Sequence, residues 1–184
     1  MNADRILYRT RQFWQALGSV PSCEDIALVS TLLAPPQQMI FQRMLRSEQA
    51  HSLRVLYGLL DQREEQKDLL VAALLHDVGK SRFPLHLWER VVIVLIRVVC
   101  PGCGKRWGER VIEGDVAPHG WRRAFIIAEE HPAWGAEMAA EAGCSRLTVN
   151  LIRRHQEMIP DSSSADLTIE DHLLLKLQAI DDES

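Results

Sequence analysis

Apolar residues along this chain recur mainly at intervals of three and four, the spacing of an amphipathic α-helix. Sustained apolar-polar alternation is absent, and no Asn-Gly or Asp-Gly pair separates two apolar runs, so hairpins are not indicated. Gly, Pro and capping residues divide the pattern into segments. We therefore expect an all-α protein with helices at about residues 3–17, 22–33, 37–61, 65–78, 84–99, 121–130, 131–143, 145–157 and 168–182.

Several helix ends have a recognisable chemical signal. Ser22 and Asp25 have the spacing of a capping box at a helix N-terminus. Gly79 is expected to close the helix over 65–78 in the left-handed conformation. Pro132 is expected in the first turn of a new helix, where its missing N–H costs nothing, and Gly143 at the end of that helix.

Two segments are less regular. The β-branched run Val91–Val99 is assigned to the helix over 84–99, but a buried strand stays open because periodicity does not exclude it. Residues 101–120 contain five glycines and two prolines and are expected to form an irregular insertion. We expect a single domain over residues 1–184, with residues 1–45 as an N-terminal helical extension.

Composition and charge narrow the class of protein. With 184 residues, 47% hydrophobic and 25% charged, the chain has the balance of a soluble globular domain. A net charge of −4 gives no basis for non-specific nucleic-acid binding. The longest apolar run, Val91–Cys100, is too short to span a bilayer, and the N-terminus lacks a secretory apolar core. A cytoplasmic location is therefore expected.

The four cysteines do not indicate a disulfide scaffold in a chain of this length. Cys100 and Cys103 have the spacing of half a zinc knuckle. A structural zinc needs four ligands, and no second Cys-x-x-Cys exists. A turn with both thiols reduced is the favoured interpretation, with the zinc knuckle as the alternative.

The strongest chemical signal is the pair His76-Asp77, which follows the apolar run 72–75. Burying an imidazole beside a carboxylate is costly unless a partner compensates for the lost water, and a metal ion can do so. His51 lies in the middle of a stripe on the helix over 37–61, and further candidates follow near predicted helix ends. The candidate ligands are His51, His76, Asp77, His131, His155 and Asp181, whereas His86, His119 and His172 are taken as ordinary histidines. Imidazoles with carboxylates suit Zn, Mn, Fe or Ni better than Mg or Ca.

This pattern resembles the HD-domain phosphohydrolase superfamily. The resemblance runs from about residue 49 to residue 182, and its most specific piece is the segment 73–80, Ala-Leu-Leu-His-Asp-Val-Gly-Lys. His51-Ser52 is similar to the family's first-histidine segment, and His131-Pro132 to its third. Ile152-Arg153-Arg154-His155 is similar to the fourth, and the segment 177–181 to the closing aspartate. The resemblance implies a helical bundle of roughly seven to nine helices.

The resemblance also implies a ligand set and a reaction. His51, His76, Asp77 and Asp181 would bind one metal, and His131 and His155 would extend the site to a second, with Asp77 bridging. One or two divalent ions (Mn, Fe, Ni, Co or Zn) are implied, together with a metal-activated hydroxide that attacks a phosphate ester. The expected activity is therefore a metal-dependent phosphohydrolase or phosphodiesterase.

Three cations are candidates for contact with the substrate. Lys80 follows Gly79 and is placed both in catalysis and in phosphate binding, with a solvated lysine as the alternative. Arg54, three positions after His51, and Arg154, next to His155, are candidates for binding a polyanion, with surface placement as the alternative. The substrate is expected to be a small phosphorylated molecule, most simply a nucleotide. The residues after His155 lack the Gly-Tyr-Pro of the cyclic-di-GMP-degrading subgroup.

Two other classes of function stay open. The chain could be a metal- and nucleotide-binding sensor or interaction module with little turnover, which the insertion at 101–120 would allow. It could also be a helical adaptor that binds no metal. Hydrolysis that depends on Asp77 would separate the enzyme from both.

Overall fold

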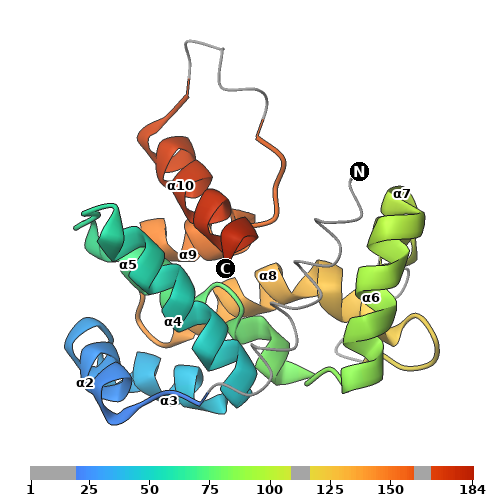
Figure 1. The fold of residues 1–184 in the computed structure, drawn as a ribbon, viewed down its shortest axis with the longest axis horizontal. Coiled ribbons are helices and arrows are strands. Elements are labelled where there is room, and N and C mark those ends of the chain that lie inside the picture. The colour runs from blue at the N-terminus through green and yellow to red at the C-terminus, as the bar shows by residue number, and fades with distance from the viewer. Residues whose placement is uncertain (1–19, 109–116, 160–166) are drawn as a thin grey trace.

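A computed structural model describes residues 20–108, 117–159 and 167–184, and these are helical with no strand among them (Figure 1). The all-α prediction is confirmed. The predicted helix over 3–17 lies outside the described residues. The elements are α2 (Cys23–Leu32), α3 (Pro35–Arg43), α4 (Arg46–Asp61), α5 (Lys67–Leu75), the 3₁₀ turn η1 (Val78–Arg82), α6 (Leu87–Val99), α7 (Pro101–Gly108), α8 (Arg123–Glu141), α9 (Arg146–Arg154) and α10 (Ile169–Glu183).

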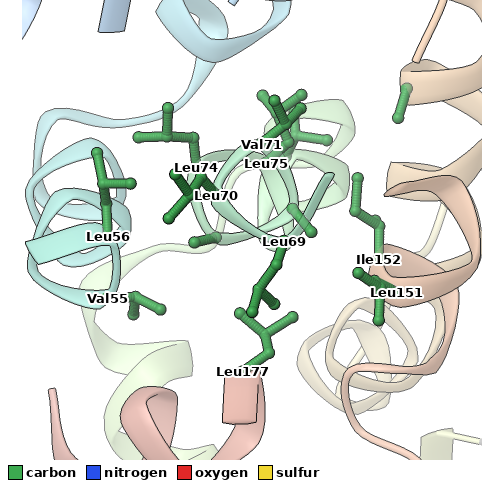
Figure 2. Packing of buried hydrophobic residues seen from close by; sticks show 14 of the residues in the cluster. Val55, Leu56, Leu69, Leu70, Val71, Leu74, Leu75, Leu151, Ile152 and Leu177 are labelled. Atoms are coloured by element: carbon green, nitrogen blue, oxygen red, sulfur yellow. The ribbon is translucent and has the colours of Figure 1, made fainter. Parts of the chain in front are cut away.

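The helix α5 is the centre of the main core. Its residues from Leu69 to Leu75 are all buried, as expected for a helix that is apolar on every side. Figure 2 shows side chains of α5 pointing outward in several directions, toward Leu56 on α4, Ile152 on α9 and Leu177 on α10. Three neighbouring helices therefore fix the C-terminal end of α5, where His76 and Asp77 follow.

Residues of α2 and α3 belong to the same core. The cluster around α5 includes Val29 on α2, Leu33 at the C-cap of α2, and Ile40 and Phe41 on α3. The described part of the predicted extension over 1–45 is thus packed into the bundle. A second, smaller core joins α6 to α8 through residues such as Ile93 and Ile127.

The single long helix predicted over 37–61 is wrong, because α3 and α4 are separate. Met44 takes an extended conformation, with a ψ of 151°. The Glu48 carboxylate accepts a hydrogen bond from the Leu45 N–H and starts the new helix. The Gln49 amide donates to the Met44 carbonyl and to the Phe41 carbonyl, at 3.0 and 3.3 Å. Side chains that follow the break therefore satisfy the backbone groups that the break exposes.

The two helices predicted over 121–130 and 131–143 form one continuous helix, α8, with Pro132 inside it. The prediction that His131 begins a helix is therefore wrong. Proline removes the N–H that would bond to the Ala128 carbonyl, but the His131 ring donates to that carbonyl through Nδ1 at 2.9 Å. Gly143 follows α8 with a φ of +75°, as expected for a helix end.

Gly79 does not have the predicted left-handed conformation, since its φ is not positive. Its role is close packing. A Cβ at this position would overlap the His131 carbonyl and the Gly135 amide of α8, so only glycine lets η1 approach that helix.

The region after Pro84 confirms one prediction and corrects two. Val91–Val99 is part of the helix α6, so the strand alternative is excluded. Residues 101–108 form the helix α7 where an irregular insertion was predicted, and residues 109–116 lie outside the description. Cys100 and Cys103 form a disulfide, which corrects the predicted reduced turn. Among the described residues, no helix is long and apolar enough to cross a membrane.

Candidate metal centre

The bundle brings all six predicted ligands together. His51 lies on α4, His76 and Asp77 follow α5, and His131 is in the middle of α8. His155 caps the C-terminal end of α9, and Asp181 lies in the last turn of α10. Residues separated by as many as 130 positions thus meet at one place, because α4, α9 and α10 pack against α5 while α8 packs against η1 and α9.

One group of ligand atoms comes from His51, His76 and Asp77, which all lie within 4.8 Å of one another. Asp181 adjoins this group. Its Oδ1 lies 2.8 Å from His51 Nε2 and 3.4 Å from His76 Nε2. These two imidazoles and two carboxylates could supply the four ligands that a tetrahedral transition-metal site uses.

A second group comes from Asp77, His131 and His155, again with ligand atoms within 4.8 Å of one another. Asp77 Oδ1 lies 3.2 Å from His131 Nε2 and 3.9 Å from His155 Nε2. The two imidazole Nε2 atoms are 3.2 Å apart. Asp77 is common to both groups, and its other oxygen, Oδ2, lies 3.7 Å from His76 Nε2. Asp77 is therefore the residue that joins the two candidate ligand groups.

The three buried histidines are oriented alike. Each Nδ1–H donates to a carbonyl on its own helix: His76 to Ala73 at 2.9 Å, His131 to Ala128 at 2.9 Å, and His155 to Ile152 at 2.7 Å. When such a ring is neutral, its donation from Nδ1 leaves the Nε2 lone pair free, and the bond to the carbonyl holds the ring in place. All three Nε2 atoms therefore face the centre as potential ligands.

The surroundings of His76 Nε2 are the clearest indication that a metal ion binds at this centre. The His76 ring is fully buried, and Nε2 makes no hydrogen bond to any described residue, although Asp181 Oδ1 lies 3.4 Å away. A buried polar atom without a partner is costly, and native structures rarely leave one. A metal ion bound between the carboxylates and this nitrogen would satisfy it, so the residues present fit a divalent ion.

The electrostatic environment also favours a cation. Burial opposes the charged form of His76, but Asp77 and Asp181 outweigh it and raise the pKa of His76 to about 9. Burial also opposes ionisation of Asp77, but Lys80 and His76 hold its pKa well below the usual range. Both aspartates are therefore ionised at neutral pH, since the pKa of Asp181 is likewise lowered, against its burial, by His76 and His51.

The second pair of histidines is neutral. Burial lowers the pKa of His155 to about 3, and the charges of His131 and His76 act in the same direction. Burial also lowers the pKa of His131, assisted by Lys80. Neutral imidazoles are the form that binds metals.

The centre opens to solvent on one side. The side chains of His76, Asp77, His131 and His155 are between 1% and 6% exposed. His51 is 22% exposed and Asp181 29%. A ligand therefore has access past the pair from α4 and α10, whereas the α8 and α9 side is closed.

The three predicted substrate cations have different surroundings. Lys80 Nζ donates to Asp77 Oδ2 at 2.6 Å and is 24% exposed, so it reaches from the buried carboxylate to the surface. Arg54 is half-buried, and burial lowers its pKa. Arg154, in contrast, already has three carboxylate partners within the protein: its nitrogens bond to Glu157, Glu170 and Asp171, each at 2.7 Å. This arrangement joins α9 to α10 and leaves little of Arg154 for a substrate.

Glu48 is a buried acid beside the centre that was not predicted. Its Oε1 accepts from Arg90 Nη2 at 2.6 Å, which ties α4 to α6. Burial raises the pKa of Glu48, against the charges of Lys80 and Arg90. Its position three residues before His51, on the same helix face, is the signal that could have indicated it.

Comparison with known protein families supports the assignment of this site as a metal centre of the HD type. Residues 49–98 match the family model of the HD domain. The match confirms the resemblance to this family over these residues, which include His51, His76, Asp77 and Lys80. HD domains include metal-dependent phosphohydrolases. No curated protein and no solved structure gives a significant match. His131, His155 and Asp181 lie outside the matched segment, and the structure alone brings them to the same place.

Proposed function

We propose that this protein is a metal-dependent phosphohydrolase or phosphodiesterase that acts on a nucleotide or another small phosphate ester. The observation that carries the proposal is the pair of ligand groups that share Asp77. His51, His76, Asp77 and Asp181 would hold one divalent ion, and Asp77, His131 and His155 a second. Such ions would polarise a phosphoryl oxygen and lower the pKa of a coordinated water.

The chain's own residues would position the substrate. Lys80 already donates to Asp77 and reaches the surface, so it can also donate to a phosphate oxygen at the open side. Arg54 lies one turn beyond His51 on α4. Among the described residues, none forms an ion pair or hydrogen bond with its half-buried guanidinium. Because a half-buried cation without a partner favours an anion, we assign Arg54 to substrate phosphate.

Hydrolysis of bis-(p-nitrophenyl) phosphate tests the proposal. The protein is stripped of metal and reconstituted separately with Mn, Fe, Ni, Co or Zn. We expect metal-dependent hydrolysis that Asp77→Asn abolishes and that His172→Ala, at an exposed histidine on α10, leaves unchanged. Tight metal binding with no hydrolysis of this ester or of a panel of nucleotides, dinucleotides and cyclic dinucleotides would instead support a sensor. Absence of bound metal would support an adaptor.

The substrate cations are tested by the same assay. Lys80→Gln should lower kcat, because Lys80 contacts both the bridging carboxylate and the reacting phosphate. Arg54→Gln should raise KM with a smaller change in kcat. Arg153→Gln, at an exposed arginine on α9, is the matched control. If Arg54→Gln and the control behave alike, Arg54 does not contact the substrate.

A further inference from the structure

The Cys100–Cys103 disulfide lies where α6 ends and α7 begins. Cys100 follows the last residue of α6 and directly precedes Pro101, the first residue of α7. Cys103 lies in the first turn of α7, where its N–H donates to the Cys100 carbonyl at 2.9 Å. Both cysteines are partly exposed. A Cys-x-x-Cys disulfide therefore spans a helix N-terminus at the surface.

This position favours reversible chemistry. A thiolate at a helix N-terminus is stabilised by the backbone N–H groups and the helix dipole, which lowers the pKa of the thiol. Cys100 directly precedes the first residue of α7 and also caps the C-terminal end of α6, so the N–H groups of α7 favour its thiolate whereas the α6 dipole opposes it. The disulfide also closes a very short loop, with a sequence separation of only three. A short loop constrains the unfolded chain least, so this bond contributes less to stability than a long-range disulfide does.

The helix α7 is packed tightly against α8, the helix that carries His131. A Cβ at Gly104 would lie 3.8 Å from the Phe125 ring, and a Cβ at Gly108 would overlap the Phe125 carbonyl and the Glu129 side chain. The Trp107 ring lies 5.2 Å from the Phe125 ring and 5.5 Å from the Trp121 ring, in edge-to-face geometry. Trp107 on α7 therefore contacts Phe125 on α8, so a change at the start of α7 would reach α8 through this ring pair.

We propose that Cys100 and Cys103 are a redox-active pair that exchanges electrons with a dithiol. A thiolate of the dithiol attacks Cys103 Sγ, the Sγ–Sγ bond breaks, and Cys100 leaves as the thiolate at the helix N-terminus. The second thiolate of the dithiol then attacks its own sulfur in the mixed disulfide and releases Cys103. The protein gains two electrons and two protons, and the dithiol becomes a disulfide. This site is independent of the metal centre and of the proposed hydrolysis.

The test uses the full chain with Cys23→Ser and Cys144→Ser, which removes the two free cysteines. The protein is equilibrated in buffers with varied ratios of reduced to oxidised dithiothreitol, its thiols are trapped with a maleimide, and the intact mass is measured. We expect a reversible two-electron transition in which both labels appear together. A disulfide that persists in every buffer would be a structural crosslink. A pair that stays reduced, or that binds zinc between two copies, would also overturn the proposal.

A second measurement tests the assigned roles. In the same background, Cys103→Ser leaves Cys100 alone and Cys100→Ser leaves Cys103 alone. If the N–H groups of α7 outweigh the α6 dipole, iodoacetamide should react about tenfold faster with Cys100 than with Cys103 at neutral pH. Equal rates would overturn the assignment. Reduction of the disulfide should also change the tryptophan fluorescence. If the change arises at α7, Trp107→Phe should remove most of it. Tryptophan fluorescence that does not change on reduction would exclude transmission through α7.

Discussion

Pro132 frees a backbone carbonyl that orients the ring of the preceding residue, His131. In an uninterrupted helix the N–H of residue 132 would bond to the Ala128 carbonyl, but proline has no N–H. The His131 Nδ1–H takes that place at 2.9 Å and also lies 3.1 Å from the Ile127 carbonyl. The Nε2 atom is thereby directed at Asp77, 3.2 Å away. A residue that is unfavourable inside a helix thus helps to hold a candidate ligand.

Pro132→Ala tests this relationship. The new N–H would compete for the Ala128 carbonyl and loosen the ring, so we expect affinity at the His131 site to fall by about tenfold, the low end of the effect of removing a partner of a metal-bound histidine. Stability should stay equal or rise, because alanine suits a helix interior better. Manganese titration against a fluorescent chelator measures the affinity, with Pro36→Ala as control. Unchanged affinity would show that the Ile127 carbonyl holds the ring alone.

Metal stoichiometry separates the two ligand groups. Elemental analysis of the reconstituted protein should give two ions per chain. His131→Ala and His155→Ala should each leave one, whereas Asp77→Ala should reduce the content below one because its carboxylate belongs to both groups. His172→Ala should retain two. A content of one ion that is insensitive to His155→Ala would contradict the second site.

The central features of the fold could be predicted from the sequence because their causes are local. A continuous apolar run predicts that α5 is buried on all sides, and the adjacent His76-Asp77 then has to lie at the end of a buried helix. Two features of the fold were missed because they depend on hydrogen bonds from side chains to the backbone, which hydrophobic periodicity does not reveal. The break after α3 depends on Gln49, and the continuity of α8 depends on a ring that replaces the N–H missing at Pro132.

The same reasoning explains the difference between two of the predicted site residues. His155 was identified from its place at a helix end, which is a local property. Arg154, its neighbour, was assigned to a substrate because a sequence does not show which carboxylates another helix will bring close. Glu170 and Asp171 on α10 occupy it. The disulfide between Cys100 and Cys103 was also missed, because spacing alone does not distinguish thiols from a bond.

Gly79→Ala should destabilise the protein. A Cβ would overlap the His131 carbonyl and the Gly135 amide, and backbone atoms inside a helix cannot move aside as a flexible side chain can. Overpacking of this kind costs about 1–3 kcal/mol. Urea unfolding measures the loss. The control is Gly102→Ala, since a Cβ there meets nothing within 4 Å; equal stability of the two variants would show that η1 can shift away from α8.

Arg154→Gln should lower stability without lowering hydrolysis, because its three carboxylate partners belong to the protein. Pairs of this exposure contribute little singly, so a fall in Tm of about 2–4 °C is expected. A marked rise in KM with unchanged Tm would instead place Arg154 at the substrate.

The stabilising effect of Arg154 should disappear in acid. Hydrogen bonds from Thr168 and Arg154 lower the pKa of Asp171 to about 2, and the pKa of Glu170 is lowered through Asn150 and Arg154. A carboxyl group whose pKa is lower in the folded state stabilises the fold above its unfolded pKa, near 4, and loses this effect as the pH falls through the folded value. The difference in unfolding free energy between the wild type and Arg154→Gln should therefore be constant from pH 7 to about pH 5. It should then shrink toward pH 2. A difference that does not change with pH would mean that Arg154 stabilises the protein by packing rather than by charge.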